Sequence, residues 1–306
     1  MFMATTTALP STPESLLPLV LKAMEGAPSP RLRQLMASLT THLHQFVTEN
    51  QVTEDEFAVA VEFITGIGQA TGPQKNEVIL AADLLGVTSL VALLNNPAGT
   101  ALEHESRAAA RVSHAALLGP FWRAAAPLCA PGESIVRSHT PGDTLEVCGT
   151  VFGADGQPVA GATVDVWHAS PNGWYENQEE AQADMNLRGR FTTDAQGKYW
   201  LRTVVPAGYP VPTDGPCGQL LDAQQRHPIR PAHLHFMVSS PGHRVLVTQV
   251  FPHDDERLNS DPVFGVTAPL VGHFENTQID GRPGQRLVHD FHLTAGETVF
   301  PKPPIP

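Results

Sequence analysis

The segment Arg230-Pro231-Ala232-His233-Leu234-His235 combines an arginine with two histidines spaced two residues apart. It leads into the apolar run 236–238, which predicts a β-strand. Side chains alternate across a strand, so His233 and His235 are expected on the same face. Two adjacent imidazoles supply half of a metal site. The His-x-His pattern alone is equally compatible with an ordinary surface strand.

Two of the three tyrosines, Tyr175 and Tyr209, lie upstream of this segment in turns rich in glycine and proline. A phenol titrates near 10, so tyrosine binds a metal only where a strongly Lewis-acidic ion removes its proton. Ferric iron does so in tyrosinate-ligated haem enzymes, whereas zinc and copper sites use His and Cys more often. Either tyrosine taken alone is more often a packing residue whose hydroxyl meets a backbone group.

Length, charge and cysteine usage restrict the class of protein. A chain of 306 residues allows one large or two medium domains. The net charge of −12 argues against nucleic acid or an anionic membrane as a partner. The N-terminus has no signal-peptide pattern, and no apolar run is long enough to cross a bilayer. Three widely spaced cysteines indicate free thiols. Together these features predict a soluble, cytoplasmic protein.

The pattern of apolar residues changes along the chain. Helical spacing over 32–47, a capping box formed by Thr53 and Glu56, and an apolar run over 78–94 predict N-terminal helices. From about Pro131 onward, turn signals separate short runs rich in Val, Thr, Phe and Tyr. This second pattern favours an antiparallel β-sandwich, so the expected fold class is α+β. The expected strands are 144–152, 163–168, 189–193, 198–204, 233–239, 244–251 and 286–293.

The sequence resembles the intradiol ring-cleaving dioxygenases over nearly its whole length. The resemblance rests on Leu118-Gly119-Pro120-Phe121, on 161–169, on Tyr209-Pro210 and on 227–235. It implies an α-helical dimerisation domain at 1–110 and a β-sandwich catalytic domain at 111–306. It also implies a homodimer joined through the N-terminal helices and one non-haem Fe(III) per chain. The expected reactants are O2 and an aromatic diol or triol.

The resemblance also assigns roles to individual residues. The implied metal ligands are Tyr175, Tyr209, His233 and His235. The implied catalytic residues are Tyr209, which would leave the iron and act as a base, Arg230 beside the substrate, and Gln249 near the iron. The residues expected to bind substrate are Leu80, Asp83, Leu117, Pro120, Phe121, Pro210 and Val263.

Within this family the cues favour hydroxyquinol (benzene-1,2,4-triol), cleaved to maleylacetate. The segments 184–191, 209–216 and 261–266 look most like those of hydroxyquinol-cleaving enzymes. Catechol enzymes usually carry an acidic residue where this chain has Leu118. Asp83 could accept a hydrogen bond from a third ring hydroxyl, although a polar helix-surface residue is nearly as good an interpretation. Catechol or chlorocatechols, cleaved to cis,cis-muconates, remain alternative substrates. The segment 155–162 also resembles transthyretin-like binding modules, which are sandwiches without catalysis.

Overall fold

The computed structural model describes residues 9–72, 75–95 and 112–304. The chain divides into two compact units, 1–65 and 66–306, so the helices that follow residue 76 belong to the unit that contains the sheets. The boundary expected from the sequence, between 110 and 111, lies outside the described residues and stays a prediction. The three cysteines, all described, are free thiols as expected.

The first unit is helical, as the sequence predicts. It holds α1 (Pro13–Ala23), α2 (Pro30–Asn50) and most of α3 (Glu54–Gln69). The predicted capping box starts α3: the Thr53 amide donates to Glu56 Oε2 over 2.8 Å, and the Glu56 amide donates to Thr53 Oγ1 over 3.3 Å. These three helices contain no buried residue in the described chain. Their exposed apolar side chains include Leu32, Leu35, Leu39, Leu43, Phe46 and Phe57.

The apolar run over 78–94 forms two helices rather than the single helix expected. α4 (Glu77–Leu84) and α5 (Val87–Asn95) meet at a bend of 78°. Gly86 has φ +70 at the break, a left-handed conformation that favours glycine and that ends a helix. Among the described residues no single helix is long and apolar enough to cross a membrane, although this bent pair passes that test by length and composition.

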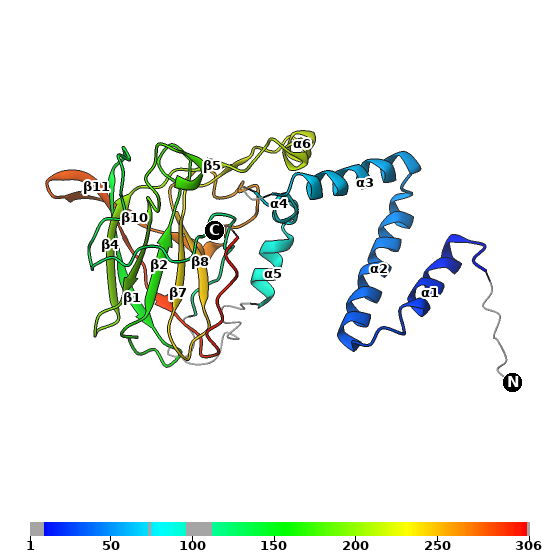
Figure 1. The fold of residues 1–306 in the computed structure, drawn as a ribbon, viewed down its shortest axis with the longest axis horizontal. Helices are drawn as coiled ribbons and strands as arrows, with labels where there is room; N and C mark the ends of the chain where they lie inside the picture. The colour runs from blue at the N-terminus through cyan, green and yellow to red at the C-terminus, as the bar shows by residue number, and fades with distance from the viewer. Residues whose placement is uncertain (1–8, 73–74, 96–111, 305–306) are drawn as a thin grey trace. The chain divides into compact units, whose positions relative to one another are not determined.

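The second unit contains two five-stranded sheets in addition to helices, which confirms the α+β class (Figure 1). One contains β1 (Thr144–Phe152), β4 (Lys198–Val204), β10 (Phe274–Ile279), β11 (Arg282–Val288) and β12 (Phe291–His292). The other runs in the order β3-β2-β7-β8-β9, and its strands are β2 (Thr163–Trp167), β3 (Arg188–Thr192), β7 (Leu234–Ser239), β8 (Leu246–Pro252) and β9 (Val271–Gly272).

Not every strand pair is antiparallel, in contrast to the expectation from the sequence. β1 pairs in parallel with β11 and β12, and β8 pairs in parallel with β9. Short elements lie between the main strands: β5 (Tyr209–Pro210) pairs with β6 (Ile229–Arg230), and α6 (Pro216–Ala223) lies in the long connection between them. The remaining short elements are the 3-10 turns η1 (Glu176–Gln178) and η2 (Ala268–Leu270).

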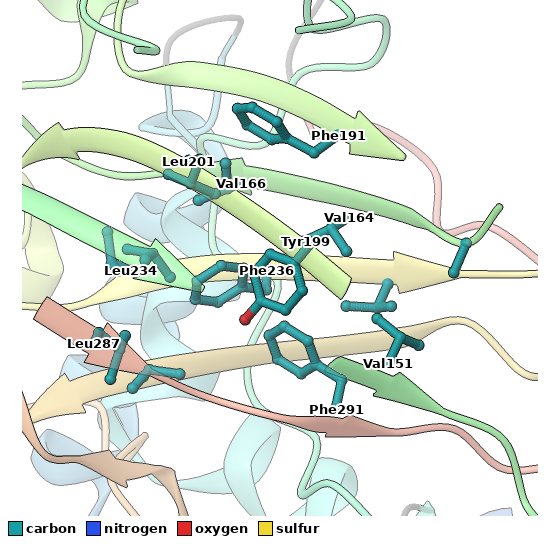
Figure 2. Packing of buried hydrophobic residues seen from close by; sticks show 14 of the residues in the cluster. Val151, Val164, Val166, Phe191, Tyr199, Leu201, Leu234, Phe236, Leu287 and Phe291 are labelled. Carbon is teal, nitrogen blue, oxygen red and sulfur yellow. The ribbon is translucent and has the colours of Figure 1, made fainter. Parts of the chain in front are cut away.

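Alternation along the strands builds the core between the two sheets (Figure 2). Val164 and Val166 of β2 and Phe236 of β7 are fully buried and point inward with Phe291 of β12. Tyr199 lies in the same core and donates its hydroxyl to the His289 carbonyl over 2.7 Å. The intervening residues of β2 and β7 therefore project from the opposite face of their sheet, where the candidate site is built.

Candidate metal and substrate site

His235 lies on the outer face of β7, and His233 immediately precedes this strand. Their Nε2 atoms lie 3.1 Å apart, so the expectation from the His-x-His spacing is met. The ring of Trp167 on β2 stacks on His235 at 4.8 Å between centroids and with 10° between the planes. His233 Nδ1 faces the Pro231 carbonyl at 2.8 Å. Both rings are buried and held in fixed orientations.

The environment keeps both imidazoles neutral. Burial, followed by the charge of Arg230, lowers the pKa of His233 to about 3. Burial, followed by His233, holds the pKa of His235 well below its ordinary value. A neutral His233 that donates from Nδ1 to the Pro231 carbonyl carries a lone pair on Nε2. That lone pair points at the second imidazole nitrogen, as it would toward a shared cation.

Tyr175 and Tyr209 close the cluster from two loops. Tyr175 precedes η1, Tyr209 lies in β5, and their rings meet edge to face at 5.6 Å between centroids. The ring of Tyr209 also lies 5.4 Å from that of His233. Tyr175 Oη is buried and has no hydrogen-bond partner among the described residues. Burial, followed by the proximity of Tyr209, raises the pKa of Tyr175 well above its ordinary value.

These four side chains fit a ferric ion. The buried Tyr175 hydroxyl without a partner is costly by itself, whereas a cation could bind it together with the lone pairs of the two imidazoles. A phenol whose pKa is raised releases its proton only to a strongly Lewis-acidic ion. No group of three or more His, Cys, Asp or Glu in the described chain could hold a metal. Two phenol oxygens favour a hard ion such as Fe(III).

A buried ion pair holds Tyr175 in place. Arg188 Nε donates to Glu176 Oε1 over 2.7 Å, and Arg188 Nη1 donates to the Phe121 carbonyl over 2.6 Å. The guanidinium lies 5.6 Å from the centroid of the Tyr175 ring, against which Phe121 also stacks at 4.4 Å. The Arg188–Glu176 pair thus fixes Tyr175, a candidate metal ligand, together with Phe121 of the pocket.

Arg230 lies beside the histidines and is fully buried. Its Nη1 is 3.2 Å from His233 Nε2, and its Nη2 donates to Gln249 Oε1 over 3.2 Å. Gln249 in turn donates to the Leu117 carbonyl over 2.6 Å. Asp261 accepts from Arg230 Nε and Nη2 over 3.1 and 3.0 Å. Burial opposes the charge of Arg230, but Asp261 and then Tyr209 raise the pKa of Arg230 above its ordinary value.

A pocket leads from α4 to this cluster. Six of the seven expected substrate residues line it, together with Tyr209 and Arg230: these six are Leu80, Asp83, Leu117, Pro120, Phe121 and Val263. The seventh, Pro210, is exposed and is not among the lining residues. The pocket also has lining residues that the sequence did not indicate, namely Lys75, Asn76, Glu77, Ile79, Gly119, Val211 and Pro212.

Asp83 and Glu77 are buried carboxylates that line this pocket, and Glu77 Oε2 is paired with Lys75 Nζ at 3.3 Å. The side chain of Asp83 is 9% exposed, and its Oδ1 atom has no hydrogen-bond partner among the described residues. Burial is the main cause that raises the pKa of Asp83 to about 6. An unsatisfied buried acceptor that lines a pocket is suited to a ligand that brings a hydroxyl donor.

Comparison with known proteins agrees with this geometry. The family described as Catechol dioxygenase N terminus matches residues 29–102, and the family described as Dioxygenase matches 117–295. A hydroxyquinol 1,2-dioxygenase of a Rhizobium species is 41% identical over 88% of this chain and 87% of that protein. A catechol 1,2-dioxygenase of Candida albicans is 36% identical and covers 89% of each. A solved structure of hydroxyquinol 1,2-dioxygenase from Pseudomonas putida superposes with a TM-score of 0.83 at 37% identity, over 93% of this chain and 99% of that one.

Proposed function

Because the chain belongs to the intradiol ring-cleavage dioxygenase family, we propose that it cleaves hydroxyquinol with O2 to give maleylacetate. The reaction breaks the bond between two adjacent hydroxylated ring carbons and adds both oxygen atoms of O2 to the product. Family membership also settles the class of protein: the chain is an enzyme, not a transthyretin-like binding module.

The observation that carries the choice of hydroxyquinol is the unpartnered Asp83 Oδ1 in the pocket. Asp83, Tyr209 and Arg230 all line this pocket. A ring whose 1,2-diol lies at the Tyr209 end can present a third hydroxyl to the carboxylate. Catechol has no such hydroxyl and would leave a buried acceptor without a donor. Hydroxyquinol is also the substrate named for several relatives at 37–41% identity.

Tyr175, Tyr209, His233 and His235 are the residues that would hold one Fe(III) per chain. Bound there, Fe(III) supplies Lewis acidity, which withdraws charge from an aromatic diol. The neutral His233 and His235 provide lone pairs without adding charge, and Trp167 keeps the His235 ring in orientation. Two phenolate ligands would lower the reduction potential of a bound iron and so would favour its ferric state.

Three further residues act on the substrate or its surroundings. Tyr209 lines the pocket and is placed to accept a proton from a substrate hydroxyl. Arg230 offers a buried positive charge to the negative charge that develops on the ring. Gln249 connects Arg230 to the Leu117 wall and so keeps the guanidinium aimed at the pocket.

Substrate comparison tests this proposal. We expect the iron-loaded protein to consume one O2 for each hydroxyquinol and to release a ring-opened dicarboxylate, with a higher kcat/KM than for catechol or 4-chlorocatechol. A preference for catechol would select the alternative that the Candida relative represents. Failure to open any of the three rings with full iron occupancy would reject the proposed activity.

We further propose a cytoplasmic homodimer assembled through the N-terminal helices. α2 and α3 expose apolar residues such as Leu43, Phe46 and Phe57 and bury none in the described chain. A second copy of the same helices would cover these side chains, and two-fold dimers are the commonest closed assembly. The net charge of −12 supports a partner other than nucleic acid or an anionic membrane.

A further inference from the structure

One carboxylate joins the arginine of the site to the wall of the pocket. Asp261 Oδ1 accepts from Arg230 Nε over 3.1 Å, and Asp261 Oδ2 accepts from Arg230 Nη2 over 3.0 Å. The two side chains are only 2% and 4% exposed. A two-point contact between a planar guanidinium and a carboxylate fixes both position and plane, which a single hydrogen bond does not.

The same carboxylate holds the turn that carries Val263. Asp261 Oδ2 accepts the Gly265 amide over 3.0 Å, and Oδ1 faces the Val263 amide at 3.4 Å. Between them Phe264 has φ +54, a left-handed conformation that is strained for a residue with a side chain. The Asp261 contacts therefore hold a turn that its own sequence does not favour.

Gly265 shows how closely the turn packs on the arginine. A Cβ atom at this position would lie 2.8 Å from Arg230 Nη2 and 3.1 Å from Asp261 Oδ2. Any larger residue must therefore displace the paired charges. On its far side the turn is held independently, because the buried Ser89 hydroxyl donates to the Val263 carbonyl over 3.0 Å.

We propose that Asp261 is a positioning residue that orients Arg230 for the chemical step and sets the Val263 wall of the pocket. With Nε and Nη2 occupied by Asp261, and Nη2 also shared with Gln249, the Nη1 edge of Arg230 is left on the side of His233. Substrate fit and turnover then depend on one carboxylate. This inference rests on the proposed role of Arg230 in stabilising charge on the substrate ring.

The decisive variant is Asp261→Asn, measured beside Arg230→Ala and the double variant. Asparagine keeps the size and one acceptor oxygen but places an NH2 group against the guanidinium. We expect kcat for hydroxyquinol to fall about 10- to 100-fold, the range seen when a partner of a site residue is removed. KM should change as well, because the same carboxylate holds the Val263 turn. In the Arg230→Ala background the same change should lower kcat no further, because the residue it positions is absent.

Two further variants separate the two roles. Gly265→Ala keeps every charge yet displaces Arg230, so kcat should fall here as well, even if Asp261→Asn does not fold. Ser89→Ala releases Val263 without touching Arg230, so it should change KM and the ratio of hydroxyquinol to catechol turnover more than kcat. Asp280→Asn, which removes an exposed partner of Arg202 at 2.8 Å, is the matched control and should behave as the wild type.

The outcomes distinguish this inference from the proposed function beneath it. If Arg230→Ala leaves kcat unchanged, the proposed role of Arg230 is wrong. If Arg230→Ala lowers kcat but both Asp261→Asn and Gly265→Ala retain wild-type kcat, only the positioning role is wrong. If the losses of kcat in Asp261→Asn and Arg230→Ala add up in the double variant, the positioning role of Asp261 is also wrong. Iron content and the visible absorption band should stay at wild-type values in Asp261→Asn, so their loss would assign Asp261 to structural support of the metal site.

Discussion

Replacing Asp83 by alanine should remove the preference for a third ring hydroxyl. The carboxylate is buried in the pocket, and one of its oxygens lacks a protein donor. Tyr209 and Arg230, where the diol is proposed to bind, line the same pocket. We therefore expect Asp83→Ala to slow hydroxyquinol cleavage strongly and catechol cleavage little.

The size of the effect follows from the chemistry of the contact. A hydrogen bond to a charged group contributes about 1.5–3 kcal/mol. At about 1.4 kcal/mol per factor of ten, the ratio of kcat/KM for hydroxyquinol to that for catechol should fall about 10- to 150-fold. The loss should appear in hydroxyquinol turnover, because catechol offers Asp83 no donor in either protein.

Steady-state kinetics with both substrates measures this ratio in the wild type, in Asp83→Ala and in a control. Asp222→Ala is suitable as the control because it removes an exposed carboxylate from α6 in the same unit. An unchanged ratio in Asp83→Ala would refute the proposed contact. A proportional loss for both substrates would show that Asp83 supports the pocket rather than selecting the ring.

The raised pKa of Asp83, about 6, adds a pH signature. Only the carboxylate is a strong acceptor, so the preference for hydroxyquinol should rise as pH increases through about 6 and should be flat in Asp83→Asn.

The effect of pH on stability has the opposite sign. Burial raises the folded pKa of Asp83 from 3.8 to about 6, so the neutral carboxyl costs the fold nothing below about pH 3.8. The free energy of unfolding falls as the pH rises from there through about 6. Asp83→Asn should therefore raise the free energy of unfolding by about 3 kcal/mol at pH 8 and by less at pH 5.

Three other predictions concern the metal, the arginine and the assembly. Tyr175→Phe and Tyr209→Phe should both change the visible band of the iron-loaded protein, but Tyr209→Phe should lower kcat more because it also removes a base; full turnover in both would contradict the assignment. Arg230→Ala should lower kcat about 100-fold or more with unchanged iron content; iron loss with normal turnover per iron would oppose this. Light scattering should give a dimer for the wild type and a monomer for a Leu43→Glu, Phe46→Glu variant, whereas a wild-type monomer at micromolar concentration would reject the interface.

The sequence predicted local structure well where one pattern dominated. The strands expected at 144–152 and 198–204 have these bounds in the structure, and the Thr53 capping box begins α3. The expectation of a single helix over 78–94 is wrong. The apolar periodicity continues through Gly86, and only the left-handed φ of Gly86 shows that the helix breaks there. The parallel ladders of β1 could not be foreseen, since alternation specifies which face is buried but not the direction of a neighbour.

Only part of the candidate site could be predicted from the sequence. Alternation along β7 predicts that His233 and His235 share a face, and their Nε2 atoms do meet. That Tyr175 and Tyr209 join them depends on long loops, so it came from the family resemblance rather than from spacing. The sequence indicated Asp261 only as part of the segment 261–266. Its pairing with Arg230 could not be predicted, because the two residues are 31 positions apart and only the fold brings them together.

The most direct test of the account is the visible spectrum of the protein loaded with ferric iron, measured together with its iron content. We expect one iron per chain and a charge-transfer band from tyrosinate to Fe(III), with both lost in His233→Ala because an open site with one ligand fewer binds iron weakly. The band should respond to anaerobic addition of hydroxyquinol. A protein that binds iron stoichiometrically yet stays colourless, or one that cleaves hydroxyquinol at full rate without iron, would contradict a ferric site built from Tyr175, Tyr209, His233 and His235.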